Sequence, residues 1–221
     1  EAVVQYEQAL RQHPAYAEAA SNMGTAMQAL GHVDDARIWF EHALRSRPGF
    51  VQARVNLANL EAAECDAEQA VTIYRQLLAE APSAETWNNL GNSLQQLGRF
   101  DESLDAYWKA LEANPGYFLV HNNIGNLMRR QGRMAEAVSA FERALTHNPA
   151  FAEALNNLGV TLADLGRTVD AETHYERAIA AKPDYPDPWI NLGNLRRDAG
   201  QPRRAVECYR TAAGINLQNG Y

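Results

Sequence analysis

Asparagine recurs at one position through almost the whole chain. The members of this first set are Asn22, Asn56, Asn89, Asn123, Asn157 and Asn191. Successive members lie 33 or 34 residues apart. A carboxamide has two N–H donors and an oxygen with two lone pairs, and it carries no charge. A regular row of carboxamides therefore suits the N–H and C=O groups of an extended peptide, whatever the side chains of that peptide.

A second set of asparagines follows three residues after the first. Its members are Asn59, Asn92, Asn126 and Asn194, with Thr25 and Val160 at the two other equivalent places. Helix residues three apart share a face, so we predict that the two sets form one peptide-binding surface, the asparagine ladder. Arg129 and Arg130 lie beside it in sequence, and we predict that they bind acidic residues or a carboxylate. Two alternatives stay open: the amides cap local polar groups or stay solvated, and the arginines belong to a solvated charged face.

The residue types that carry catalysis form no comparable pattern. The six histidines are scattered, and there is no HExxH or paired-cysteine metal motif. The sequence also has no glycine-rich phosphate loop and no nucleophile-elbow serine. We therefore predict no catalytic residue, no metal and no cofactor, so that this stretch of chain is not itself an enzyme.

The asparagines belong to a repeat that runs through the sequence. Every repeat except the last closes on a proline, and these are Pro14, Pro48, Pro82, Pro115, Pro149 and Pro183; Leu217 stands at the equivalent place in the last. Apolar residues or glycine at repeat positions 4, 7, 8 and 11 predict a first helix, and glycine at position 15 ends it. A second apolar stripe at positions 20, 24 and 27 predicts a second helix, which the proline ends. Such a helix pair buries both faces only when it is stacked on its neighbours.

Residues 84–115 show the repeat most clearly, in the stretch AETWNNLGNSLQQLGRFDESLDAYWKALEANP. With Trp87, Leu90, Gly91, Tyr107 and Pro115 in register, it resembles the tetratricopeptide repeat (TPR). The resemblance implies an all-α fold: a right-handed α-solenoid, or superhelix, of stacked antiparallel helix pairs in 34-residue units. It also implies that the first helices line a concave groove that carries the asparagine ladder. The NNLGN-like motifs are similar to those in the superhelix of O-linked N-acetylglucosamine transferase and in related bacterial TPR proteins.

We predict a single TPR solenoid over residues 1–221. It consists of a half unit, 1–16, and the full units 17–50, 51–83, 84–117, 118–151, 152–185 and 186–219. The half unit lacks a first helix and no polar capping helix follows the last unit, whereas solenoids normally need polar end caps. We therefore expect a segment of a longer protein, with self-association through the uncapped ends as the alternative.

Composition narrows the function classes. The formal net charge is −7 and the pI is near 5.4, which disfavours nucleic acid as the partner. No apolar run is long enough for a membrane span and no secretory signal is visible, so we predict a cytoplasmic protein. Cys65 and Cys208 lie in distant repeats, so we expect free thiols.

The predicted function is a protein-protein interaction scaffold that binds an extended peptide or a partner helix through the asparagine ladder. The alternative is a substrate-recognition TPR arm of a larger enzyme, such as an O-GlcNAc-transferase-like glycosyltransferase.

Overall fold

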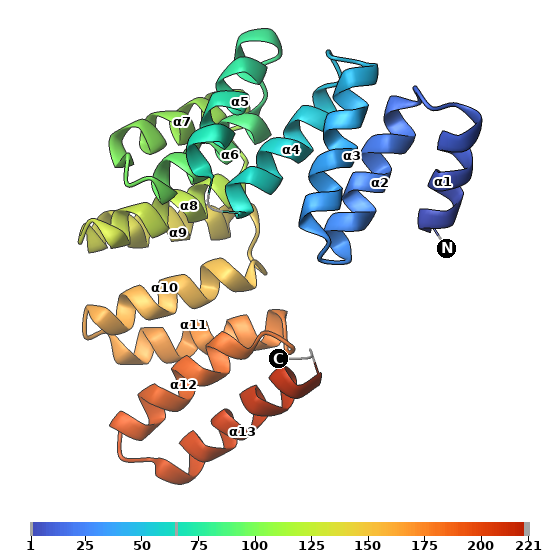
Figure 1. The fold of residues 1–221 in the computed structure, drawn as a ribbon. Helices are drawn as coiled ribbons and strands as arrows, with labels where there is room; N and C mark the ends of the chain where they lie inside the picture. Colours follow the sequence, from blue (N-terminus) through green and yellow to red (C-terminus); the bar gives the residue numbers. More distant parts are fainter. Residues whose placement is uncertain (1, 65, 219–221) are drawn as a thin grey trace. The chain divides into compact units, whose positions relative to one another are not determined.

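A computed structural model describes residues 2–64 and 66–218, and these residues form α-helices with no strand among them. The helices are α1 (Ala2–Gln12), α2 (Ala17–Ala29), α3 (Val33–Ser46), α4 (Val51–Ala63), α5 (Ala67–Glu80), α6 (Ala84–Gln96), α7 (Phe100–Ala113), α8 (Phe118–Arg130), α9 (Met134–His147), α10 (Ala152–Asp164), α11 (Thr168–Ala181), α12 (Pro186–Asp198) and α13 (Pro202–Gln218). Figure 1 shows them in chain order. The prediction of an all-α fold is therefore confirmed.

The chain divides into two compact units. The first spans Glu1–Asn114 and contains α1 to α7, and the second spans Pro115–Tyr221 and contains α8 to α13. The single solenoid over residues 1–221, with its boundaries between repeats, stays a prediction.

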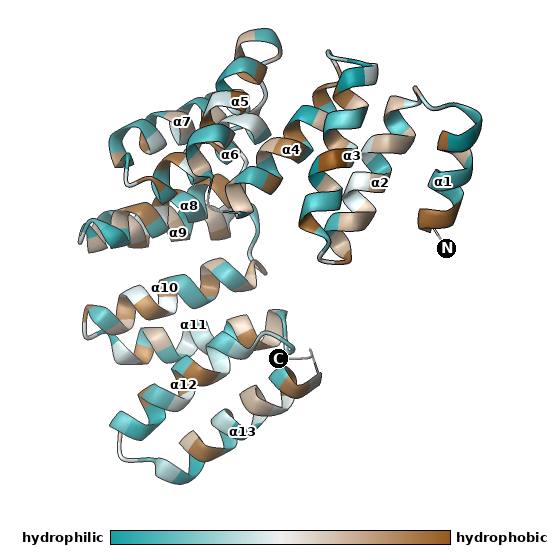
Figure 2. Ribbon diagram, viewed as in Figure 1, coloured by the Kyte–Doolittle hydropathy of each residue, from teal (hydrophilic) through white to brown (hydrophobic). Residues whose placement is uncertain are grey.

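Helices stack in the same way inside each unit. The first helix of every repeat, the A helix, packs against the second, the B helix: α2 on α3, α4 on α5 and α6 on α7 in the first unit, and α8 on α9, α10 on α11 and α12 on α13 in the second. Each B helix also packs against the next A helix of its unit. The predicted stack of antiparallel helix pairs is confirmed. Brown apolar and teal polar residues alternate along the helices in Figure 2, as one-sided burial requires.

Close packing inside a repeat explains the glycine at position 8. A Cβ built on Gly91 of α6 would lie 2.5 Å from the Tyr107 ring of α7, a buried side chain. The Ser103 hydroxyl, also buried, donates a 2.7 Å hydrogen bond to the Gly91 carbonyl oxygen. The missing side chain therefore lets the two helices approach each other closely.

The turn between the paired helices depends on a second glycine. Gly98 follows the end of α6 with a φ of 74°, in the left-handed region that side chains disfavour. The residues with the same conformation in the other repeats are Gly31, Gly132, Gly166 and Gly200. Repeat two has Cys65 at this place, which lies outside the described residues. The other cysteine, Cys208, is buried as a free thiol.

Contacts between successive repeats are apolar at some junctions and ionic at others. Val71 of α5 and Leu94 of α6 belong to one buried apolar cluster. One junction earlier, the equivalent residues are Arg37 and Glu61, which form an ion pair with Nε 2.8 Å from Oε1. The carboxylate is 4% exposed and the guanidinium 33% exposed. In the second unit the charges are exchanged: Arg196 of α12 pairs with Glu172 of α11 at 3.5 Å.

Candidate functional site

The A helices of each unit lie next to one another, and this arrangement positions the asparagines. In the first unit α4 contacts both α2 and α6, and in the second α10 contacts both α8 and α12. Equivalent residues of successive A helices therefore form rows within each unit. Asn22 is exposed, and the other five members of the first asparagine set are half-buried.

In the second unit two members of the first asparagine set, Asn157 and Asn191, are tied to the preceding repeat. Asn157 of α10 donates from Nδ2 to the Asn122 amide oxygen of α8 at 3.1 Å. Asn191 of α12 donates in the same way to Asn156 of α10 at 2.9 Å. The two accepting asparagines are buried, so each bond joins a half-buried amide to a buried one across a junction between repeats.

In the first unit, asparagines of the first set also donate hydrogen bonds to the preceding A helix, but to different acceptors. Asn89 of α6 donates to the Asn59 amide oxygen of α4 at 3.1 Å. Asn56 of α4 has its Nδ2 3.4 Å from the hydroxyl oxygens of both Ser21 and Thr25 of α2. A side chain of the first set therefore bridges adjacent A helices at both junctions.

The second set of asparagines accepts hydrogen bonds from tyrosines of the same repeat. The Tyr107 hydroxyl donates to the Asn92 amide oxygen at 2.7 Å, and Tyr209 donates to Asn194 at 2.8 Å. Tyr74 donates to Asn59 in the same manner. Burial raises the pKa of Tyr107 above its ordinary value, so its hydroxyl keeps the proton that it donates.

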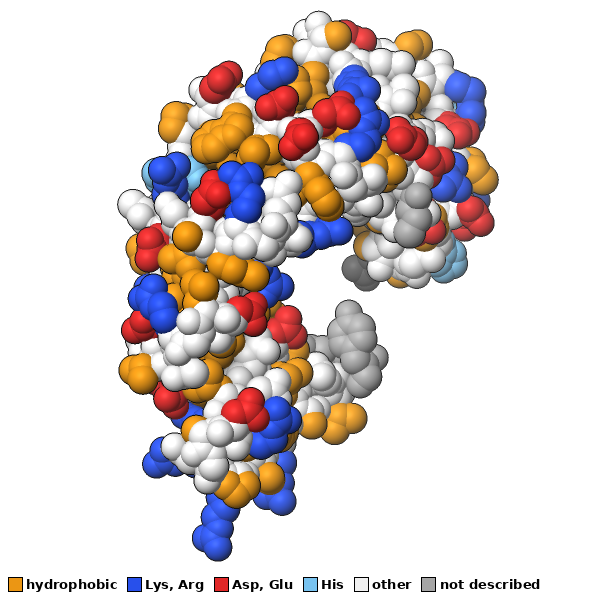
Figure 3. Space-filling model, turned by 90° about the vertical axis from the view of Figure 1, so that its left-hand side faces the viewer, with side chains coloured by type: hydrophobic (Ala, Val, Ile, Leu, Met, Phe, Trp, Pro, Cys, Tyr) orange, Lys and Arg blue, Asp and Glu red, His pale blue; other side chains and the backbone are white. Residues whose placement is uncertain are grey.

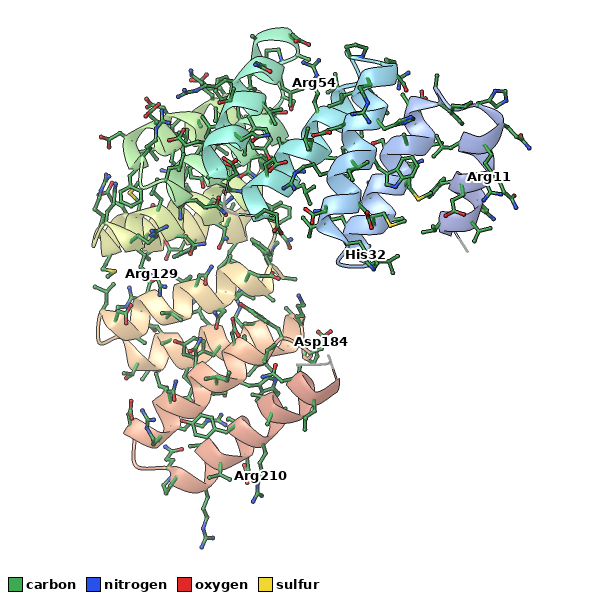
Figure 4. All side chains as sticks on the ribbon, viewed as in Figure 1. Arg11, His32, Arg54, Arg129, Asp184 and Arg210 are labelled. Atoms are coloured by element: carbon green, nitrogen blue, oxygen red, sulfur yellow. The ribbon has the colours of Figure 1, made fainter. Side chains whose placement is uncertain are left out.

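Arg129 and Arg130 lie at the last turn of α8, and Figure 4 labels the first of them. Arg129 Nη1 lies 4.0 Å from Asp164 Oδ2 of the next A helix, α10, and both side chains are partly exposed. Arg130 is exposed, and its side chain is not without a partner. Acidic and basic side chains are likewise intermingled on the face drawn in Figure 3. The structure thus places both arginines in the last turn of one A helix, α8, with Arg129 next to an acid.

Some residues of this network lie outside the predicted ladder. They are Ser21, Thr25, Asn122, Asn156 and the three tyrosines. Asn122 and Asn156 stand one residue before the predicted asparagines and 34 residues apart, so the repeat spacing contained a signal for them. The repeat pattern indicates only that the tyrosines are core aromatics, and the structure shows that their hydroxyl groups reach the ladder.

Groups that could support other chemistry do not gather in the same way. Within residues 2–64 and 66–218, no cluster of three or more His, Cys, Asp or Glu side chains could hold a metal ion. In the same described ranges, no helix combines the length and apolar character that crossing a membrane requires.

Family models for the tetratricopeptide repeat match residues 1–50, 22–85 and 122–186, and also 84–117 and 186–219. The chain belongs to the tetratricopeptide repeat family. This fold is typically a non-catalytic scaffold for protein interactions. A search among curated proteins found no match.

Solved structures show the same TPR fold. The APC/C hetero-tetramer Cut9-Hcn1 is 18% identical with a TM-score of 0.79; the match covers 98% of this chain and 43% of that one. The chain thus spans less than half the length of that relative. TTC0263, a TPR protein from Thermus thermophilus, is 21% identical with a TM-score of 0.70, covering 81% of this chain and 98% of that one. YrrB, described as a TPR protein with an unusual peptide-binding site, is 20% identical with a TM-score of 0.58, covering 89% and 97%. At these identities the likeness concerns the fold alone.

Proposed function

We propose that this TPR protein binds a peptide of a partner protein, in extended or helical form, along the asparagine ladder. The observation that supports this most is the repetition of half-buried amides on adjacent A helices within each unit. Asn56 and Asn89 in the first unit, and Asn157 and Asn191 in the second, are anchored to the repeat before them. Asn157 and Asn191, in successive repeats, have the same role and equivalent bonds. A surface that repeats along a stack suits a ligand whose own bonding groups repeat, and a peptide main chain is such a ligand.

Anchoring favours binding because it lowers the cost of ordering the side chains. Each immobilised side chain costs about 0.5–1.5 kcal/mol at an interface. The Nδ2 of Asn157 already donates one hydrogen bond across the repeat junction. Its second N–H and its oxygen remain for a ligand, since a carboxamide has two donors and two lone pairs.

Arg129 and Arg130 give the proposed site its charged end. Arg129 lies 4.0 Å from Asp164 and is 36% exposed, so its guanidinium has donors left for a second partner. An acidic residue of the peptide next to the ladder would bind here, and the ion pair with Asp164 sets the position of the guanidinium beforehand.

The test compares peptide binding by the parent protein and by a triple variant, Asn89→Ala, Asn123→Ala and Asn157→Ala. The probe is a fluorescein-labelled peptide pool of random sequence, and fluorescence anisotropy gives the affinity. Each lost amide leaves peptide groups unpaired at about 1–3 kcal/mol, so the triple variant should bind at least tenfold more weakly. Asn114→Ala is the control, since Asn114 is an exposed residue after α7 and outside the ladder.

Circular dichroism of the same variants separates binding from folding. Asn89 and Asn157 also lose one bond between repeats, so we expect a modest fall in melting temperature with unchanged helix content. Equal affinity of the parent and the triple variant would place any binding away from the ladder and contradict the proposal.

A further inference from the structure

The hydroxyl groups of three B-helix tyrosines end on amides of the ladder. The hydrogen bonds run from Tyr74 to Asn59, from Tyr107 to Asn92 and from Tyr209 to Asn194. In every case the tyrosine hydroxyl donates to the amide oxygen, but the Tyr107 hydroxyl has one proton and also lies 3.1 Å from Gln95 Oε1. A carboxamide is planar, so an oxygen turned toward the tyrosine leaves the NH₂ group on the other side. In the structure the hydroxyl holds the amide oxygen toward the core, and the NH₂ group faces away from it.

Asn59 shows this effect most clearly. Its oxygen accepts from both the Tyr74 hydroxyl and the Asn89 Nδ2. A carboxamide oxygen has two lone pairs, so both are used inside the protein. Asn59 is exposed, and the group that it can offer to a ligand is its NH₂. It thus acts as a hydrogen-bond donor to a carbonyl oxygen.

Asn191 and Asn194 of α12 form a pair with opposite roles. Asn191 uses Nδ2 to hold Asn156, which leaves its oxygen as an acceptor. Asn194 uses its oxygen to accept from Tyr209, which leaves its NH₂ as a donor. The two residues lie three apart on one helix face. Together they offer one acceptor and one donor, which are the groups that one residue of an extended chain needs for its N–H and C=O.

We propose that Tyr74 and Tyr209 are positioning residues that fix Asn59 and Asn194 of the second set as donors toward a peptide main chain. This inference rests on the proposed function and specifies the ligand: main-chain carbonyl and N–H groups bind, and repeats two and six hold them most firmly.

Repeats four and five lack the tyrosine–amide pair and provide controls. Repeat five has a buried Tyr175, but Val160 stands where the amide would be. Repeat four has Asn126 opposite Phe141, which has no hydroxyl. The Phe141 ring contacts the Cβ position of Gly125 at 2.5 Å, as the Tyr107 ring contacts that of Gly91. The two rings therefore occupy equivalent places.

The experiment removes or adds single hydroxyl groups. Tyr74→Phe and Tyr209→Phe should each weaken binding of the random peptide pool by roughly three- to tenfold, the worth of one hydrogen bond. The control Tyr175→Phe removes the hydroxyl of a buried tyrosine whose repeat has Val160 in place of the amide, and it should leave the affinity unchanged. Phe141→Tyr should strengthen binding, because it gives Asn126 the bond that it lacks. The same pool with N-methylated main-chain amides should bind all variants weakly.

A second readout needs no ligand. In the free protein, the side-chain NH₂ resonances of Asn59 and Asn194 should shift in the corresponding Tyr→Phe variants and stay in place in Tyr175→Phe. Binding by the parent with equal affinities for Tyr74→Phe, Tyr209→Phe and Tyr175→Phe would overturn the positioning role and leave the proposed function intact. Absence of peptide binding by the parent would overturn both.

Discussion

Replacement of Arg37 by valine should destabilise the first unit, because it leaves the buried Glu61 carboxylate without its partner. Arg37 holds the Glu61 carboxylate with Nε at 2.8 Å and Nη2 at 3.2 Å. Glu61 is 4% exposed, so the variant leaves a charge in a place that water reaches poorly. Breaking a fully buried pair costs about 3–5 kcal/mol. Because Arg37 is one-third exposed, we expect about 2–3 kcal/mol for Arg37→Val.

The double variant Arg37→Val, Glu61→Leu should recover that loss. It copies the next junction, where Val71 and Leu94 are both buried in an apolar cluster. Replacing a buried ion pair by packed apolar residues is often neutral or stabilising, by about 1–4 kcal/mol. We therefore expect the double variant to match or exceed the stability of the parent, with a coupling energy of about 2 kcal/mol or more.

Urea unfolding followed by tryptophan fluorescence would measure these differences. Of the four tryptophans, those in the first unit are Trp39, Trp87 and Trp108, so the signal reports mainly on the affected unit. The control is Arg45→Ala, which breaks an exposed pair with Glu41 in the same helix and should cost at most about 0.5 kcal/mol. A double variant less stable than Arg37→Val alone would refute the reasoning, as would an Arg37→Val that matches the control.

Two further outcomes are expected. Gly91→Ala should lower stability by about 1–3 kcal/mol because its Cβ would lie 2.5 Å from the Tyr107 ring, whereas Gly49→Ala, with open space around it, should be nearly neutral in thermal melts. Burial lowers the pKa of His121, which stacks on His147 at 5.5 Å and lies near Arg143. The unfolded chain then binds a proton that the folded one does not. The stability should therefore be constant above a pH of about 6.5 and fall below it. His121→Phe should remove part of that fall, and an unchanged dependence of stability on pH would count against the role of His121.

The repeat pattern predicted the fold well because it is local. Glycines such as Gly98 and prolines such as Pro115 mark the helix ends, and both work through the conformation of a few neighbouring residues. The apolar stripe of each helix then indicates which face of that helix is buried. Helix pairs follow from these features without any knowledge of long-range contacts.

The polar network was harder to predict because it depends on geometry between helices. Tyr74 and Asn59 lie on different helices of one repeat, and the bond between them requires a particular rotation of each helix. Sequence showed that an amide was present, but the partner atom decides whether that amide presents an oxygen or an NH₂ group. Glu61 is a similar case: it departs from the apolar pattern of its position, and its reason becomes clear only when Arg37 of the preceding repeat lies opposite.

Under the proposed function, the ladder amides combine two roles that would conflict in a charged site. A buried or half-buried charge would need a paired partner, which consumes its bonding capacity and adds a desolvation cost. A carboxamide has four hydrogen-bonding positions, so Asn157 can hold Asn122 with one of them and keep the others for a ligand. The bond within the protein then also sets the orientation of the groups that remain. In the proposed site, neutral amides therefore let one row of side chains join successive repeats and present an ordered surface, which a charged residue at these positions would not do.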